Sequence, residues 1–498
     1  MTDVQAEQED IGRQVAHGAL WTLSMRLIVR LFGLVNIAIL ARLITKEDFG
    51  LVALLMSTSA VLLLLLEIIV RVALVRLPAI QPKHYGAAFI MRLLAGAIAG
   101  LVLVISARYL AAYFGEPRLE GALYVFAAIT FVEGLTSSWV VAFQRNLEFS
   151  KDFAFEVSVG VARAIACIAF AFWFRDFWAL IAGMAVAACL RVIISHIMCY
   201  GQSLKTDMQA MRDIWLACKW LSIEAIAAFV EERTDRLILG KVGTTAQLGV
   251  FSMVIDLVML PIGNLILPLG RAVLPGLHKL RSQSPDKIAA AYGAAVSSMI
   301  AISLPVGAGL VMAADPLIRT LLGDKWEEAI ILLQYLAPFM IAESVMASFN
   351  QVLIADGKLR IITVLRWART LIYLPAMYAG FVWDGLEGAV FAKSVIAVIM
   401  VLPCYFALVR GGRVRWGQEA WQMLRSVFAC AVMLLFWHET LPLLQAISPI
   451  SWVQLVCVAI EGAAIYGTAL YTVWWLTGSG DGIERRMVTL AAQKLARS

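Results

Sequence analysis

The sequence predicts an all-α protein that crosses a membrane many times. Of its 498 residues, 61% are hydrophobic and only 15% are charged, a composition far from that of soluble domains. The apolar residues gather in runs of about 20, which is long enough to cross a bilayer as a helix. Runs such as residues 61–66 lack the alternation of polar and apolar residues that marks barrel strands. We therefore expect a polytopic helical membrane protein.

We place about 14 transmembrane helices along the chain. Their predicted ranges are 18–44, 49–76, 84–107, 119–144, 153–174, 177–199, 215–240, 247–274, 288–313, 327–355, 359–382, 386–409, 420–438 and 451–476. An even number of spans puts both termini on one side. The short loops and tails on that side carry roughly 20 Lys and Arg, against about seven on the other, so we expect both termini in the cytoplasm.

The chain contains an internal repeat. Residues 40–51 resemble residues 239–250, and each stretch leaves one predicted span, turns and enters the next. The aligned pairs are Arg42 with Lys241, Thr45 with Thr244, and Gly50 with Gly249. Six spans precede each return of the pattern, so the two copies would have the same orientation in the membrane. We therefore predict two pseudosymmetric six-helix lobes plus two extra C-terminal helices.

The predicted lobes divide the chain into three parts. The N-lobe is 1–205, the C-lobe is 206–410, and 411–498 holds the last two spans and a cytoplasmic tail. Within that tail, 483–497 carries apolar residues on one side and basic residues elsewhere. This pattern favours an amphipathic helix on anionic membrane lipid or, equally, a solvated tail.

Two arginines in the first span indicate an anion-binding site. Arg26 and Arg30 are four residues apart, so they share one face of the helix. A charge in hydrocarbon is costly and is kept where it faces a partner, water or a charged ligand. The two guanidinium groups repel each other, and no acidic residue lies within one turn of either. We interpret this face as the wall of a cationic cavity.

Two further arginines would join this cavity if spans 1, 2, 7 and 8 face one another, as the repeat predicts. Arg71 lies in span 2 and Arg271 in span 8, both towards the cytoplasmic half of the membrane. Each has an alternative role. Arg71 follows Glu67 by one turn, so the two could form a buried ion pair. Arg271 is close to the membrane surface, where its side chain could snorkel towards water.

The seventh predicted span carries more charge than any other. Three of its acidic residues share a face: Glu224, Glu231 and Asp235. A helix this polar is expected to line water, and such acids are candidates for coupling transport to H⁺ or Na⁺. Asp256 in the eighth span is a fourth candidate.

The remaining intramembrane charges are expected to form interhelix pairs or to snorkel. They are Arg92, Glu133, Glu156, Arg163, Arg191, Glu343, Arg366, Arg369, Lys393 and Glu461.

The motif content predicts neither an enzyme nor a cofactor. The sequence has no P-loop, no HExxH and no GxSxG. Its seven cysteines form no CxxC pair, so we expect packing roles and no metal site. The net charge of +6 is spread over short loops, which does not favour a nucleic-acid partner. Prolines near the middle of several spans fit the bending helices of a transporter.

Four stretches resemble the polysaccharide transporter family, the Wzx-type lipid-linked oligosaccharide flippases of the MOP (multidrug, oligosaccharidyl-lipid, polysaccharide) superfamily. They are GALWTLSMRLIVRLFGLVNIAILARLITKEDFGLVAL at 18–54, FQRNLEF at 143–149, WALIAG at 178–183 and TDRLILGKVGTTAQLGVFS at 234–252. The resemblance covers about residues 12 to 420. It implies two pseudosymmetric lobes, alternating access, and a sugar chain on polyprenyl pyrophosphate as substrate.

The resemblance also implies a location for the pyrophosphate. Such flippases are thought to hold it with cations on spans 1, 2, 7 and 8, which here are Arg26, Arg30, Arg71, Arg236 and Arg271. The expected partners are the lipid-linked oligosaccharide, membrane lipids, H⁺ or Na⁺, and a glycan polymerase or export machinery. The expected role is exopolysaccharide, capsule or O-antigen (lipopolysaccharide) biosynthesis in the bacterial inner membrane. A drug/cation antiporter of the same superfamily and a membrane glycan polymerase or ligase remain as alternatives.

Overall fold

The computed structural model describes 32–67, 74, 77, 80–146, 148–201, 205–263, 285–355, 358–410, 418–447 and 450–477. Within these ranges all regular structure is helical, and nine helices are long and apolar enough to cross a membrane, or ten if one bent pair counts as a span. Two shorter apolar helices, Phe32–Leu43 and Thr245–Pro261, match parts of predicted spans. The protein is therefore an all-α, multi-pass membrane protein, while the count of 14 spans stays a prediction.

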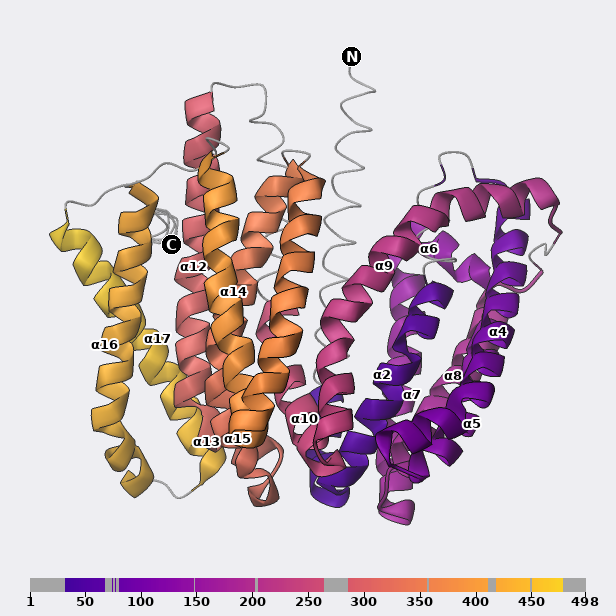
Figure 1. Cartoon of the computed structure of the whole chain (residues 1–498), viewed down its shortest axis with the longest axis horizontal. Helices are drawn as coiled ribbons and strands as arrows, with labels where there is room; N and C mark the ends of the chain where they lie inside the picture. The colour runs from indigo at the N-terminus through magenta and orange to yellow at the C-terminus, as the bar shows by residue number, and fades with distance from the viewer. Residues whose placement is uncertain are drawn as a thin grey trace. The chain divides into compact units, whose positions relative to one another are not determined.

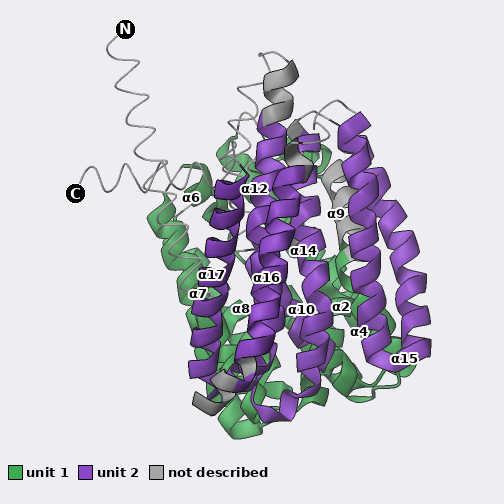
Figure 2. Cartoon of the chain, turned by 90° about the vertical axis from the view of Figure 1, so that its left-hand side faces the viewer, with its two compact units in different colours: residues 1–249 green, residues 250–498 purple. Residues whose placement is uncertain are grey.

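The chain forms two compact units, Met1–Gly249 and Val250–Ser498 (Figure 2). The helices of unit 1 are α2 (Lys46–Glu67), α4 (Pro82–Phe114), α5 (Arg118–Gly134), η2 (Ser138–Val140), α6 (Val141–Arg145), α7 (Phe149–Phe174), α8 (Trp178–Met198) and α9 (Met208–Val242). Neighbours in sequence pair as hairpins, α4 with α5 and α7 with α8, and α5 also packs on α8. These helices lie side by side in Figure 1.

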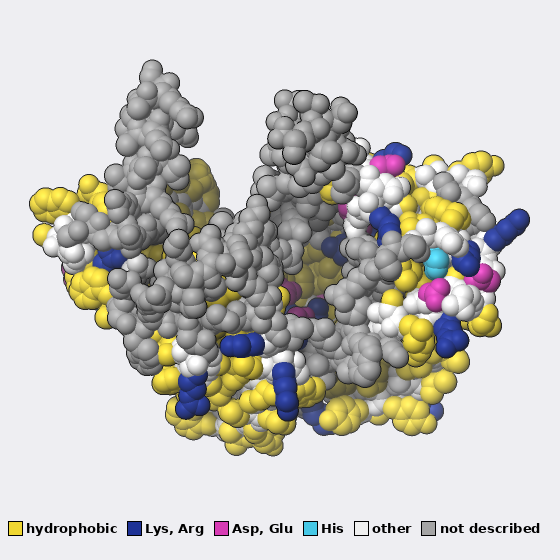
Figure 3. Space-filling view, turned by 90° about the horizontal axis from the view of Figure 1, so that it is seen from above, with side chains coloured by type: hydrophobic (Ala, Val, Ile, Leu, Met, Phe, Trp, Pro, Cys, Tyr) yellow, Lys and Arg dark blue, Asp and Glu magenta, His cyan; other side chains and the backbone are white. Residues whose placement is uncertain are grey.

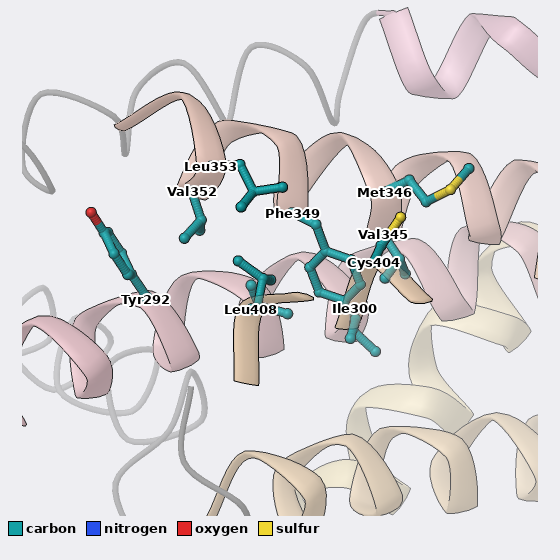
Figure 4. Close-up of a cluster of buried hydrophobic side chains, with 10 residues drawn as sticks. Tyr292, Ile300, Val345, Met346, Phe349, Val352, Leu353, Cys404 and Leu408 are labelled. Carbon is teal, nitrogen blue, oxygen red and sulfur yellow. The ribbon is translucent and has the colours of Figure 1, made fainter. Parts of the chain in front are cut away.

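Unit 2 is built from helices around an apolar core. They are α10 (Thr245–Pro261, which starts in unit 1), α12 (Pro285–Met312), α13 (Ala314–Leu321), η4 (Asp324–Trp326), α14 (Glu328–Ala355), α15 (Leu359–Arg410), α16 (Gln418–Ile447) and α17 (Ser451–Leu476). Side chains of α12, α14 and α15 interlock in one cluster, which includes Tyr292, Phe349 and Leu408 (Figure 4). The last two helices pack on each other, and α16 and α17 also pack on α12.

The long helix α15 contains two of the predicted spans. Its helical path is interrupted at Asp384 and Gly385, where Gly385 has φ 56° and ψ −139°. This backbone region is open only to glycine, because a Cβ would clash with the chain. The sequence places a loop between predicted spans 359–382 and 386–409, and the interruption falls within it. The two arms of α15 therefore match the two predicted spans.

The structure explains the repeated segment at 40–51 and 239–250. Thr45 precedes α2, and its Oγ1 accepts a 3.2 Å hydrogen bond from the backbone N–H of Asp48. Thr244 precedes α10, and its Oγ1 accepts a 3.2 Å bond from the N–H of Gln247. In both copies a threonine thus caps a helix by accepting from the N–H three positions later. The Thr244 N–H also donates to Gln247 Oε1 at 3.0 Å, which completes a capping box, whereas Thr45 Oγ1 donates to Asp48 Oδ2 at 2.8 Å. The two aligned segments therefore begin their helices in the same way.

The same two segments contact each other at glycines. A Cβ atom added to Gly50 would overlap the carbonyl oxygen of Thr245, and one added to Gly249 would overlap the carbonyl oxygen of Lys46. Gly50 and Thr245 are 195 residues apart, and Lys46 and Gly249 are 203 residues apart. The repeat aligns Lys46 with Thr245 and Gly50 with Gly249, a shift of 199 residues. Replacing each residue of one contact by its aligned counterpart therefore gives the other contact. This reciprocity is the signature of a local twofold axis. It supports the predicted internal symmetry.

Helix α9 belongs to unit 1 over its whole length. It packs on α2 and α4, and Asp207 accepts a 2.7 Å bond from the Ala210 N–H and a 3.0 Å bond from the Lys83 ammonium. The Nε2 of His84 lies 3.6 Å from an Asp213 carboxylate oxygen. Basic, acidic and histidine side chains lie close together on the right of Figure 3. The lobe limits predicted from the repeat, which assign span 7 to the C-lobe, describe sequence symmetry and stay a prediction.

We predict that Gly50→Ala and Gly249→Ala each lower the unfolding temperature of the detergent-purified protein. The added methyl group would force two backbones apart, and such overpacking typically costs about 1–3 kcal/mol. Gly467→Ala in α17 is the control, because nothing lies within 4 Å of a Cβ there. Equal unfolding temperatures for all three variants and the wild type would show that the contact between the Gly50 and Gly249 segments is not tight.

We predict that Asp207→Ala destabilises the protein more than Asp207→Asn, because asparagine can still cap α9. The Ala210 N–H and the Lys83 ammonium hold the pKa of Asp207 below its usual range. The charge therefore stabilises the fold above the unfolded-state pKa, about 3.9, and this contribution is lost as pH falls through the lower folded-state value. Melting curves of wild type and Asp207→Asn at several pH values should converge at acid pH. A gap that persists there contradicts the assignment.

Candidate functional site

Most of the predicted cationic site lies outside the residues that the structure describes. Arg26 and Arg30 precede the first of them, and Arg71 and Arg271 fall in gaps. Their grouping in one cavity therefore stays a prediction. Of the predicted anion-binding arginines, Arg236 is the one whose side chain is described.

The predicted site residues at the end of α9 are buried. Asp235 is 2% exposed and Arg236 is 8% exposed. The backbone N–H of Arg236 donates a 2.7 Å hydrogen bond to Asp235 Oδ1, and both residues make further interactions. The side chains of Glu224 and Glu231, on the same helix, lie outside those described. An adjacent acid and base that are both buried inside a membrane protein require partners, which makes this helix end a polar centre.

Asp256 has a different environment. It is exposed on α10, as is Met259 one turn later, while Ile255 and Leu257 beside it are buried. Asp256 also interacts with another part of the chain. Its accessibility is compatible with ion exchange, so its predicted coupling role stays a prediction.

Two of the predicted interhelix pairs are present. In unit 1 the Arg191 guanidinium on α8 donates to both oxygens of Glu156 on α7, at 3.4 and 3.3 Å, and lies 5.4 Å above the Phe155 ring. In unit 2 Arg369 of α15 pairs with Glu343 of α14. These four charges join neighbouring helices and thus have the structural role expected of them.

Lys393 is buried in an aromatic setting. It is 6% exposed, donates a 2.8 Å hydrogen bond to the Tyr373 hydroxyl, and lies 4.5 Å from the ring centres of both Tyr373 and Phe339. Cation–π attraction of this kind offsets part of the cost of taking an ammonium group out of water. Lys393 thereby connects α14 to both arms of α15.

The span predicted at 119–144 corresponds to a bent pair of helices and not to one straight helix. The chain breaks between α5 and η2, and the two pieces are bent by 62°. The Glu133 carbonyl freed at the break accepts hydrogen bonds from Arg92 Nε at 3.1 Å and from Thr136 Oγ1 at 2.9 Å. The Ser137 N–H donates to Ser195 Oγ at 3.0 Å. Side chains of other helices thus satisfy the backbone groups that a broken helix exposes in a membrane.

The FQRNLEF stretch has a structural explanation. The Arg145 guanidinium donates to the carbonyl oxygens of Leu74 and Leu77, both at 2.9 Å. The Gln144 amide donates to the Asp152 carboxylate at 3.2 Å. Arg145 therefore binds carbonyl oxygens of a distant segment, while Gln144 connects α6 to the first turns of α7.

Arg163 differs from the expectation of an interhelix pair. It is exposed near the middle of α7 and has no hydrogen bond or ion pair within the described part of the chain. The signal that identifies it is the exposure of this one side chain in an otherwise buried row of α7, which the sequence does not show.

Two relatives named for lipopolysaccharide and teichuronic acid biosynthesis align with most of this chain. It is 19% identical over 396 residues to "Lipopolysaccharide biosynthesis protein WzxC" of Escherichia coli (strain K12), covering 79% of this chain and 80% of that protein. It is also 19% identical over 407 residues to "Teichuronic acid biosynthesis protein TuaB" of Bacillus subtilis (strain 168), covering 79% and 82%.

Solved structures identify the fold. A structure of Lipid II flippase MurJ in an inward closed conformation matches with a TM-score of 0.76 and 12% identity, over 92% of this chain and 99% of MurJ. An inward-facing MATE multidrug resistance transporter of the MOP superfamily matches with a TM-score of 0.58 and 15% identity, over 77% and 94%. The chain therefore has the fold that MurJ and MATE transporters share.

The family follows from the sequence match itself. The model of the family described as "Polysaccharide biosynthesis protein" matches residues 39–331. That range includes both copies of the repeated segment and the broken span. Because it covers more than half of the 498 residues, the chain belongs to the polysaccharide biosynthesis protein family.

Proposed function

We propose that this protein is a flippase that moves a polyprenyl-pyrophosphate-linked oligosaccharide across the bacterial inner membrane. The observation that carries the proposal is a lipid-flippase fold over 92% of the chain, together with Arg26 and Arg30 on one face of its first span. The relatives named for lipopolysaccharide and teichuronic acid biosynthesis support a glycan substrate. The product would enter exopolysaccharide, capsule or O-antigen assembly.

The proposed mechanism is alternating access. In the inward-open state Arg26 and Arg30 bind the pyrophosphate, while the polyprenyl tail remains in the bilayer. Movement of the symmetric lobes then exposes the sugar to the outer side. The symmetric contact of Gly50 and Gly249 supports two equivalent halves, which such a movement requires. Proton or sodium coupling would use the acids of α9 and α10.

The alternative within the same fold is a drug/cation antiporter. The MATE likeness favours it as far as the fold goes. Its substrates, however, are cations, which Arg26 and Arg30 in the first predicted span, with no acidic residue within one turn, would repel.

We predict that Arg26→Ala/Arg30→Ala abolishes most surface polysaccharide in the native host. Each arginine would lose a charge-assisted contact worth about 1.5–3 kcal/mol, or roughly tenfold or more in binding. The measurement is cell-surface glycan at matched protein levels. Arg108→Ala is the control, because Arg108 is an exposed arginine near one end of α4. Full polysaccharide in the double variant would contradict the site.

We predict that a deletion strain accumulates lipid-linked repeat units on the inner face of the cytoplasmic membrane. A flippase supplies the outer leaflet, so its loss leaves the substrate where it is made. A membrane-impermeant glycan-modifying enzyme, applied to right-side-out and inverted vesicles, measures the sidedness. Accumulation on the outer face would instead indicate a polymerase or ligase. Changed drug resistance on overexpression, with normal glycan sidedness, would indicate the antiporter.

A further inference from the structure

Arg163 interrupts a buried row of side chains on α7. Residues at four-residue steps lie above one another on a helix face. Along this row Phe155, Val159, Cys167 and Ala171 are buried, with exposures of 1%, 3%, 3% and 0%. Arg163 is the central member of the same row and is exposed. A local opening in the packing therefore lies over Arg163.

The opening does not lie on the face of α7 that points away from unit 1. From Phe149 to Phe172, the other exposed side chains gather on a separate face, and they are Ser150, Lys151, Ala154, Ser158, Ile165, Ala169 and Phe172. That face is opposite to the buried one. Arg163 is thus accessible on the face by which α7 packs within unit 1.

The depth of Arg163 excludes an ordinary surface role. It lies 14 residues after the first residue of α7 and 11 before the last, which corresponds to roughly 21 and 17 Å along the helix. Snorkelling side chains lie near helix ends, so Arg163 is too deep for it. In the described part of the chain its guanidinium has no ion pair or hydrogen bond. A charge that stays in such a position needs water or an anionic ligand.

A second polar group, without a strong partner, lies next to this row. Asn36, in the helix Phe32–Leu43, lies beside Cys167, one turn after Arg163. Its Oδ1 is buried and has no hydrogen bond of ordinary geometry, and the Cys167 thiol beside it is only a weak donor. A stronger donor from outside the protein, such as a hydroxyl group or water, would therefore complete the site.

We propose that Arg163 binds the diphosphate of the transported lipid midway across the membrane, with Asn36 accepting a hydrogen bond from an adjoining hydroxyl. This inference rests on the proposed flippase function and adds a residue to its path. A guanidinium group can bind a phosphate through two parallel hydrogen bonds. A carboxylate of an acidic sugar has the same chemistry, so the test must separate the two sources.

The test compares three probes on the full-length protein in lipid nanodiscs by calorimetry. Farnesyl diphosphate carries the lipid diphosphate, farnesol carries the lipid alone, and glucuronate carries a sugar carboxylate. We expect Arg163→Gln to weaken farnesyl diphosphate binding about tenfold or more and to leave farnesol binding unchanged. Arg163→Lys should weaken it less, because the charge remains while the two-bond geometry is lost. Asn36→Ala should leave binding of farnesyl diphosphate within about twofold, because this probe has no hydroxyl group.

The matched control is Arg108→Gln, which makes the same change at another exposed arginine and should bind like wild type. Unchanged diphosphate affinity in Arg163→Gln overturns the inference, as does an equal loss of farnesol binding. Loss of glucuronate binding alone would reassign Arg163 to the sugar. If Arg163→Gln does not fold, Arg163→Lys decides the question. Equal affinities of the wild-type protein for farnesyl diphosphate and farnesol would overturn the proposed function as well.

Discussion

The cost of leaving a polar group without a partner in hydrocarbon governs this structure. Several of the described charges, and the broken backbone after Gly134, can be understood by asking what offsets that cost. Arg92 binds a freed carbonyl, Glu156 and Arg191 bind each other, and Lys393 lies between two aromatic rings. Arg163 has none of these solutions within the described chain. The same constraint that explains the paired residues therefore singles out the residue that needs a ligand.

The helical architecture was largely predictable because membranes impose it. Apolar runs set the positions of the long helices, and the turn between the two arms of α15 was expected within a few residues of Gly385. The break after Gly134 was not, since the apolar run continues through it. The partners that make the break tolerable, Arg92 and Ser195, come from α4 and α8. A break of this kind depends on tertiary contacts that local sequence does not record.

The candidate site was predictable only in part, for a related reason. An unpaired charge is recognised in sequence by the absence of an acid one turn away, and Arg26 and Arg30 meet that test. Pairs between helices escape it: Arg191 finds Glu156 on another helix. This sequence test does not detect exposure either. Arg163 is therefore distinguished from Arg191 only by the packing of α7. Whether Arg26, Arg30, Arg71, Arg236 and Arg271 share a cavity stays a prediction.

The reciprocal contact of Gly50 and Gly249 has a consequence for how such a chain could arise. A contact that maps onto itself under a twofold rotation is the kind that joins identical subunits. A half-length precursor with one Thr-capped segment and one glycine could make the same contact with a second copy of itself. In such a homodimer, a substitution at this contact would be present in both subunits. Joining two such copies in one chain would let each segment change separately, which fits Asp48 in one segment and Gln247 in the other.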